Sequence, residues 1–238
     1  IREIQSIQTQ GPSLLGGHSF GGTVAFEMAQ QLHKQGQEVA LLAIIDTAAQ
    51  EPIENQVNPF LDCKDDALWL TIVSDFLGTL FGKDLILGEP EVYYQALTKL
   101  TPEEQFNRLQ QMNFFPPGKG SKQLHGYINV MKGNALCSYF PETVAPIQIT
   151  VFNCKDKSTE ATKLNNLIAK ILMGENDFNK SIRPKNRNAP DLGWGLFSPK
   201  PVEIYEIPGN HLSMITEPSV QVLAQKLMTC IEKAQAKK

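Results

Sequence analysis

The chain has 238 residues, of which 42% are hydrophobic, and its formal net charge is −3 at pH 7. This length and apolar content fit one globular domain with an insertion, and the weakly negative charge gives no sign of a nucleic-acid-binding surface. We find no apolar run of about 18 residues and no secretory leader, so we expect no membrane span and no membrane partner. Four scattered cysteines lack metal-site spacing and indicate reduced thiols in a cytoplasmic protein. The cysteine spacing gives no reason to expect a metal, and because no phosphate-binding glycine loop is present, we expect no cofactor.

The first fifty residues have the pattern strand, turn, helix, strand. Residues 13–16 form a short apolar run typical of a buried strand. Apolar residues then recur at four-residue spacing between Val24 and Leu32, which predicts a helix ending near Gly36. The uninterrupted, branched apolar run 39–45 predicts a second strand, covered on both faces of a parallel sheet.

The turn between the first strand and the helix carries a chemical motif. Residues 16–22 read Gly-Gly-His-Ser-Phe-Gly-Gly and contain Gly-x-Ser-x-Gly, the nucleophile elbow of α/β-hydrolases. Glycines are needed there because side chains would clash with the neighbouring helix and strand. The motif and its context predict that Ser19 is a nucleophile, the alternative being a plain strand–helix–strand unit with a surface serine.

A nucleophilic serine needs a base, usually a histidine held by a carboxylate. In α/β-hydrolases the acid and then the histidine follow the serine in the chain. His211 lies in a loop just past the predicted last strand, residues 202–207, where this chemistry places its base. We expect His18 to pack in or line the site, His33 to be solvated, and His125 to have a structural role.

Two acidic residues are candidates for the orienting carboxylate. Asp46 ends the predicted strand 39–45, and Asp156 ends the next predicted parallel strand, residues 149–156. Both lie at the C-terminal edge of the sheet, where ligands bind in such folds. The residues alone leave this choice open, and either carboxylate could instead cap a backbone turn.

Helical patterns dominate residues 51–144. Three apolar stripes are expected to serve mostly as packing between helices. They are Trp69, Ile72, Phe76 and Leu80; Phe106, Leu109 and Met112; and Leu124, Ile128, Met131, Leu136 and Tyr139. Residues 114–118 predict a loop or hinge. Further along, residues 164–173 suggest a helix, residues 183–188 a flexible polar loop, and Glu217-Pro218 the start of the last helix.

Several blocks of the chain, in order and over nearly its whole length, closely resemble the thioesterase domains that end nonribosomal peptide synthetases and polyketide synthases. The matching blocks include residues 3–8, Gly11-Pro12, residues 16–22, residues 24–29, Asp46-Thr47, Gly193-Trp194, residues 208–211, Met214 and Glu217-Pro218. The resemblance implies an α/β-hydrolase-like, mostly parallel sheet flanked by helices. It implies a single thioesterase domain over residues 1–238, with residues 1–50 and 145–238 as the hydrolase core and about 51–144 as a helical lid insertion.

The resemblance also implies site residues. In these domains the acid follows the strand after the nucleophile helix, which makes Ser19, Asp46 and His211 the catalytic triad. The backbone N–H of Phe20, directly after the nucleophile, would be one oxyanion donor.

The activity implied by the resemblance is release of an acyl chain from a carrier protein. The serine takes the chain, peptide or polyketide, from a phosphopantetheine thioester, and water or a nucleophile within the chain then releases it. A free-standing editing thioesterase or another serine esterase is the alternative enzyme, and a catalytically incomplete interaction module is the alternative outside enzymes. The loop 183–188 is expected to be solvated, or else to touch an acidic carrier protein.

The start of the chain departs from the family pattern. Only 18 residues precede Ser19, and they provide for one strand and a short helix with Ile1, Ile4 and Ile7 on one face. The family's earlier strands and its second oxyanion donor are therefore not accounted for. We expect this chain to be a fragment of a longer domain, or a partner to supply the missing strands.

Overall fold

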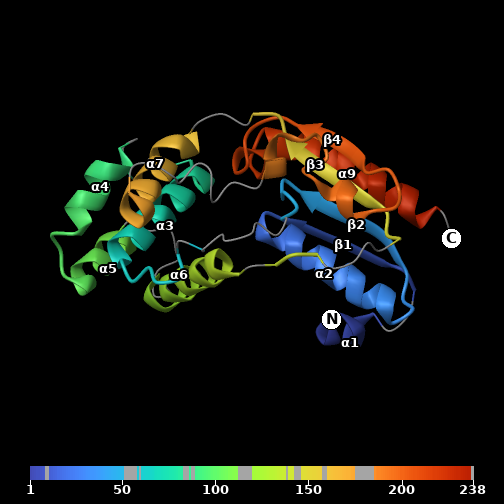
Figure 1. The fold of residues 1–238 in the computed structure, drawn as a ribbon, viewed down its shortest axis with the longest axis horizontal. Helices are drawn as coiled ribbons and strands as arrows, with labels where there is room; N and C mark the ends of the chain where they lie inside the picture. Colours follow the sequence, from blue (N-terminus) through green and yellow to red (C-terminus); the bar gives the residue numbers. More distant parts are fainter. Residues whose placement is uncertain are drawn as a thin grey trace. The chain divides into compact units, whose positions relative to one another are not determined.

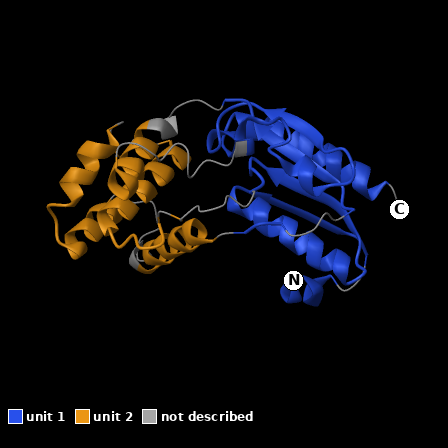
Figure 2. Cartoon of the chain, viewed as in Figure 1, with its two compact units in different colours: residues 1–53, 139–157, 184–238 blue, residues 54–138, 158–183 orange. Residues whose placement is uncertain are grey.

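The computed structural model describes residues 1–8, 11–50, 58, 60–82, 86, 89–111, 120–137, 139–141, 146–156, 160–174 and 185–236. The chain divides into two compact units, coloured separately in Figure 2. Unit 1 comprises Ile1–Ile53, Tyr139–Lys157 and Pro184–Lys238, and unit 2 comprises Glu54–Ser138 and Ser158–Arg183.

Unit 1 contains the strands of the described part of the chain. Its elements are α1 (Arg2–Ile7), β1 (Ser13–His18), α2 (Phe20–Lys34), β2 (Val39–Ile45), β3 (Ile149–Cys154), the 3-10 helix η1 (Lys185–Asn188), the 3-10 helix η2 (Trp194–Phe197), β4 (Glu203–Ile207), the 3-10 helix η3 (Ser213–Ile215) and α9 (Ser219–Gln235). The strands pair in the order β1-β2-β3-β4, and every pairing is parallel. The expected parallel sheet flanked by helices is confirmed (Figure 1).

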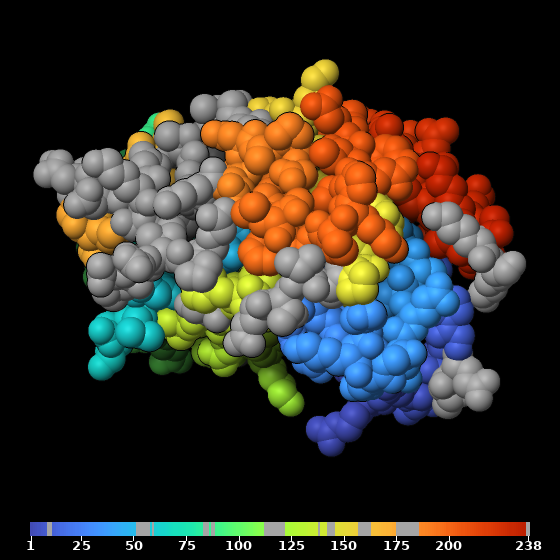
Figure 3. Space-filling model, turned by 45° about the vertical axis from the view of Figure 1, so that its right-hand side comes forward, coloured from blue at the N-terminus to red at the C-terminus, as the bar shows by residue number. Residues whose placement is uncertain are grey.

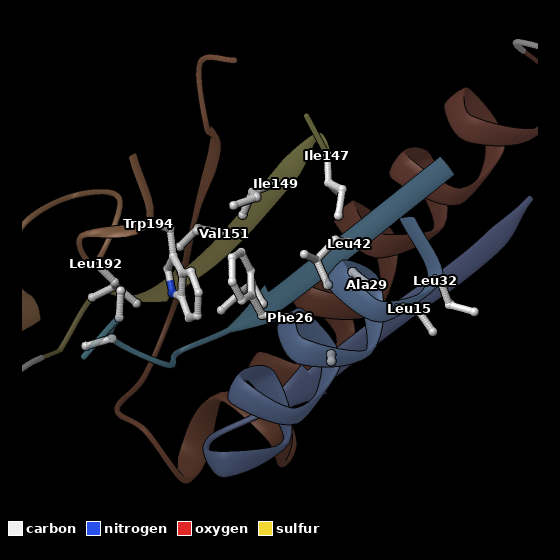
Figure 4. Close-up of a cluster of buried hydrophobic side chains, with 14 residues drawn as sticks. Leu15, Phe26, Ala29, Leu32, Leu42, Ile147, Ile149, Val151, Leu192 and Trp194 are labelled. Carbon is white, nitrogen blue, oxygen red and sulfur yellow. The ribbon is translucent and has the colours of Figure 1, made fainter. Parts of the chain in front are cut away.

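Alternate residues of a strand point to opposite faces of the sheet. In the two middle strands, β2 and β3, residues on both faces are buried. Leu42 and Ile44 of β2 pack with Phe26 of α2 in one cluster. Figure 4 labels Leu42 and Phe26 in this cluster. Leu41 and Ala43, the alternate residues of β2, pack with residues of α9 in a second cluster. Helices therefore cover both faces, which explains why β2 has a continuous apolar sequence rather than an alternating one.

Trp194 is the largest side chain in the α2-side cluster. It is 1% exposed, and its ring lies 4.7 Å from that of Phe26 between centroids (Figure 4). Its indole N–H donates a 2.6 Å hydrogen bond to the backbone oxygen of Thr47. This satisfies the one polar group of a buried tryptophan and fastens the segment before β4 to the end of β2.

Unit 2 is helical in its described residues. Its elements are α3 (Asp66–Leu80), α4 (Pro90–Leu97), α5 (Pro102–Gln110), α6 (Gly120–Leu136) and α7 (Glu160–Met173). Their N-termini carry ordinary helix signals. The Asp65 side chain accepts from Leu68 N at 3.0 Å, and Thr101 with Glu104 forms a capping box at α5.

Helix α3 lies at the centre of unit 2. It contacts α4, α5, α6 and α7, so it is covered on more than one side. Its fully buried residues include Val73 and Leu77, which lie outside the expected stripe of Trp69, Ile72, Phe76 and Leu80. The stripe was too narrow because a helix surrounded by neighbours is apolar on most of its circumference.

Two boundaries differ from those expected. We expected residues 145–238 in the sheet-containing core, but α7 lies in unit 2, where Leu164 and Ile168 pack with Leu68. Tyr139 does not continue α6, which ends at Leu136; its hydroxyl donates to Glu27 in unit 1 at 2.6 Å. Met112 and the expected hinge at 114–118 lie outside the described residues.

Candidate active site

Ser19 lies at a sharp turn between β1 and α2. Its φ and ψ are 56° and −132°, a conformation that costs energy for a residue with a side chain and often marks a functional site. A methyl group on Gly17 would collide with the backbone of Gly21, and one on Gly22 would collide with the side chain of Thr47. Close packing around the serine therefore requires glycine at positions 17 and 22, whereas a Cβ on Gly21, the second glycine of the motif, would meet nothing within 4 Å. The expected clash is confirmed at Gly17 and is not found at Gly21.

His211 connects the serine to an acid. Its Nε2 lies 3.0 Å from Ser19 Oγ, and its Nδ1 lies 2.6 Å from Asp46 Oδ2. An ionised carboxylate only accepts hydrogen bonds, so Nδ1 carries the proton and Nε2 is left to accept from the serine hydroxyl. The structure thus brings together the three side chains named from the sequence.

The carboxylate of Asp46 is fully buried and held from several sides. Besides His211, it accepts from Arg187 Nη2 at 2.7 Å and from the backbone N–H of Cys154 at 3.2 Å. Burial alone would raise the pKa of Asp46, but the His211 hydrogen bond and the Arg187 charge outweigh it and hold the pKa well below its usual range. Asp46 is therefore an anion at neutral pH.

Asp156, the alternative acid, is exposed, and its backbone N–H bonds to Gly209 O at 3.0 Å. Asp46 and Asp156 both follow parallel strands and lie at the same edge of the sheet, so the hydrogen bonds of each carboxylate decide which one is the acid. Asp46 is the carboxylate that contacts His211 directly.

The loop that carries His211 is fixed by its own polar residues. Asn210 Oδ1 accepts from the backbone N–H groups of Leu212 at 3.0 Å and Ser213 at 2.9 Å. Gly209 has φ +88°, and a Cβ there would meet the hydroxyl of Ser213. The Pro-Gly-Asn-His block is therefore a tight turn that presents the imidazole.

His18 lines the site, as expected. Its ring stacks on that of His211 with centroids 4.6 Å apart, and its Nε2 lies 2.8 Å from His211 O, so it donates to that carbonyl. Burial, and next the proximity of His211, lowers the pKa of His18. His33 is exposed on α2, and His125 stacks on Phe106 in unit 2 with centroids 3.8 Å apart.

Two residues that support the site, Arg187 and Thr47, were given no role in it from the sequence, although Thr47 lies in one of the matching blocks. Arg187 lies in the polar segment expected to be a flexible, solvated loop. It is instead part of the 3-10 helix η1 and forms an ion pair with Asp46. Thr47 donates its hydroxyl to Ser19 O, which joins the end of β2 to the nucleophile turn. An arginine in a polar run carries no local signal of a buried partner.

The N-terminus of α2 is the candidate site for a developing negative charge. Phe20 is its first residue, directly after Ser19. The first N–H groups of a helix have no partner within it, and the helix dipole favours an anion there. Phe20 N–H is thus placed in the chain where an oxyanion donor is expected.

Within the described ranges, no group of three His, Cys, Asp or Glu side chains could hold a metal ion. The described helices are also too short or too polar to cross a membrane. Cys154 and Cys230 are buried and form no disulfide.

Comparison with known proteins links this geometry to a family. Residues 1–80 match the family model described as Thioesterase domain. The chondramide synthase of Chondromyces crocatus is 28% identical over 230 residues, which are 95% of this chain and 5% of that protein. The chain therefore spans only a small part of this curated relative.

Two solved structures have a similar fold. A four-domain nonribosomal peptide synthetase bound to AMP and glycine is 27% identical, with a TM-score of 0.66, over 95% of this chain and 15% of that one. The Vlm2 thioesterase domain is 23% identical, with a TM-score of 0.54, over 89% of this chain and 66% of that one, and it shows the fold alone. The comparisons therefore confirm that the chain is similar to thioesterase domains of nonribosomal peptide and polyketide synthases, with their α/β-hydrolase fold.

Proposed function

We propose that this chain is a serine thioesterase that releases an acyl, peptidyl or polyketide chain from the phosphopantetheine thioester of a carrier protein. The observation that carries the proposal is the relay from Ser19 Oγ through His211 to the buried Asp46 carboxylate. A buried ion-paired acid holding a histidine against a strained serine is the arrangement that activates a hydroxyl as a nucleophile.

Acylation comes first. Ser19 Oγ attacks the thioester carbonyl carbon while His211 Nε2 takes the hydroxyl proton, and Phe20 N–H stabilises the oxygen that becomes negative. The intermediate collapses with cleavage of the carbon–sulfur bond. The pantetheine sulfur leaves with the proton that His211 holds, and the acyl group stays on Ser19.

Deacylation reuses the same groups. His211 takes a proton from water, or from a hydroxyl or amine of the acyl chain, as that nucleophile attacks the ester carbonyl. Collapse of the second intermediate returns the proton to Ser19 Oγ and frees an acid or a ring. Throughout, the Asp46 carboxylate stabilises the imidazolium without itself becoming protonated.

The helical unit 2 is proposed to act as the lid of this thioesterase. In the chain, its helices α3 to α6 lie between β2 and β3, and α7 lies between β3 and β4. Both segments are insertions between strands of the sheet, which supports this role. A lid shelters the acyl-enzyme from water, which decides between hydrolysis and ring closure.

A free-standing editing thioesterase, or another serine esterase, would use the same three residues. The alternatives differ in substrate, so the test compares a long acyl-pantetheine thioester, a short one and the matching oxygen ester. We expect the highest kcat/KM for the long thioester. Preference for the short thioester would favour editing, and preference for the oxygen ester would favour a general esterase.

The first experiment is intact-mass labelling of the folded chain with a fluorophosphonate. We expect one adduct on the wild-type protein and none on Ser19→Ala. The control Ser6→Ala should also give one adduct, because Ser6 is an exposed serine of α1 outside the relay. No adduct on a wild-type protein that is folded by circular dichroism would contradict the proposal and favour an interaction module.

A further inference from the structure

Residues 187–194, which precede β4, form several hydrogen bonds with residues 46–49, which follow β2. Arg187 donates from Nη2 to Asp46 Oδ2 at 2.7 Å and from Nη1 to Asp46 O at 3.2 Å. Further along, Ala49 N donates to Leu192 O at 2.9 Å, and Trp194 Nε1 donates to Thr47 O at 2.6 Å. Hydrogen bonds therefore join residues 187–194 to residues 46–49 along the length of both segments.

The grip of Arg187 on Asp46 joins side chain and main chain. The planar guanidinium contacts a carboxylate oxygen and the carbonyl oxygen of the same residue, a fork that a lysine cannot reproduce. Asp46 has φ 47°, a left-handed conformation that an aspartate adopts at some cost. Arg187 thus holds the acid in a backbone conformation that it would not favour by itself.

The two carboxylate oxygens have different partners. Oδ1 accepts from Cys154 N, while Oδ2 is shared by His211 Nδ1 and Arg187 Nη2. The Arg187 side chain is 28% exposed, in contrast to the fully buried carboxylate. Its segment, in orange, reaches the molecular surface in Figure 3. One cation therefore spans from the surface of unit 1 to the acid of the relay.

We propose that Arg187 is a positioning residue of the triad, which fixes the rotation of the Asp46 carboxylate and keeps Oδ2 aimed at His211. The inference rests on the proposed function of Ser19, Asp46 and His211. Arg187 contacts the side chain and the main chain of Asp46 and acts through that residue. Its charge compensates the buried carboxylate, which would otherwise pay the full cost of burial when His211 is neutral.

The role predicts a specific change in pH dependence. The charged or titratable groups around His211 are Asp46, Arg187 and His18, with Cys154 beside the Arg187 guanidinium. The Arg187 charge helps to hold the pKa of Asp46 low, so its removal raises that pKa, and the carboxylate that orients His211 is neutralised at a higher pH. In Arg187→Gln the acid limb of the labelling-rate profile should therefore move to higher pH.

The test uses Arg187→Gln, Arg187→Lys and the control Arg2→Gln, which removes the same charge from exposed α1. We expect fluorophosphonate labelling and thioester turnover to fall about 10- to 100-fold in Arg187→Gln, with KM nearly unchanged. Arg187→Lys should be intermediate, with the acid limb close to that of the wild type, and Arg2→Gln should match the wild type in both.

Chemical rescue separates positioning from a general loss of fold. Guanidinium chloride at low millimolar concentration should restore part of the labelling rate of Arg187→Ala, whereas sodium chloride at equal concentration should not. Equal rates and equal pH profiles in wild type and Arg187→Gln would overturn the proposal, as would the failure of guanidinium to rescue folded Arg187→Ala.

A proton NMR measurement keeps this inference separate from the proposed function. His211 Nδ1 lies 2.6 Å from Asp46 Oδ2, so the proton on Nδ1 should give a strongly downfield resonance in the wild type. We expect this resonance to move upfield in Arg187→Gln. If the wild type fails to label yet shows this change, the proposed function fails and the positioning role stands. If the resonance is absent, or is unchanged in Arg187→Gln, the positioning role is wrong.

Discussion

The two compact units are held to their structures by different constraints. In unit 1, the nucleophile turn depends on backbone contacts that admit one residue type, since Gly17 has no room for a methyl group. In unit 2, two glycines of α6, Gly126 and Gly133, have open space around them. The comparison teaches that the nucleophile turn has no room for a side chain at Gly17, whereas α6 has room for one at Gly126 and Gly133.

The largest expected effect is on the acid of unit 1. Asp46→Asn should lower kcat for thioester cleavage by about 10⁴-fold, because the amide no longer selects the His211 tautomer that accepts from the serine. Asp156→Asn, at the same sheet edge but exposed, should stay close to the wild type. The measurement is steady-state turnover of an acyl-pantetheine thioester, and equal losses in the two variants would refute the assignment of the acid.

The next effect is on stability. Gly17→Ala should reduce the free energy of unfolding by about 3 kcal/mol, because the new methyl meets the backbone of Gly21, which cannot move without displacing the turn. Urea unfolding followed by circular dichroism measures it. A midpoint equal to that of the wild type would show that the turn is looser than the glycine contacts indicate.

Acid should weaken unit 1 through the same carboxylate. The pKa of Asp46 is depressed in the folded chain, so its contribution to stability is present above its unfolded pKa of about 4 and is lost as pH falls toward the folded value. We expect the fall in Tm below about pH 4 to be smaller in Asp46→Asn than in the wild type. Parallel Tm curves for the two proteins would exclude this contribution.

A smaller effect is expected at His18. His18→Phe keeps a ring that can stack on His211 but loses the N–H that bonds to its carbonyl. We expect the fluorophosphonate labelling rate to fall about 2- to 10-fold, the cost of one neutral hydrogen bond. His33→Phe on the exposed side of α2 is the matched control, and a similar loss there would remove the specific role of His18.

The smallest effect should have the opposite sign. Gly133→Ala in α6 should raise the free energy of unfolding by about 0.5 to 1 kcal/mol, since alanine favours the helix and meets no neighbour. Urea unfolding under the conditions used for Gly17→Ala gives the direct comparison. A destabilised Gly133→Ala would mean that unit 2 is as tightly constrained at this glycine as the nucleophile turn is.

The local parts of unit 1 were predictable from the sequence. The strand at 39–45 and the turn around Ser19 are confirmed. Both could be predicted because they depend on short local patterns, and Gly17 has no room for a side chain. His211 was identifiable from chain order and its turn. The residues left Asp46 and Asp156 open, since both end parallel strands, and their contacts depend on how those strands pair.

Other features could not be read from local pattern. Arg187 lies 141 residues from Asp46 in the chain, and a polar run gives no sign of a distant buried partner. In unit 2, the burial of Val73 depends on helices that cover a second side of α3. Tyr139 follows the apolar spacing of α6 but bonds to Glu27, because the helix ends before it.

The central claim is that Ser19 carries the acyl group, and trapping that intermediate tests it most directly. The chain is mixed with a long acyl-pantetheine thioester, quenched with acid at short times and analysed by intact mass and peptide mapping. We predict an adduct of the acyl mass on the peptide that contains Ser19, absent in Ser19→Ala. Thioester cleavage that proceeds at the same rate in Ser19→Ala, with no adduct on the wild type, would contradict the account.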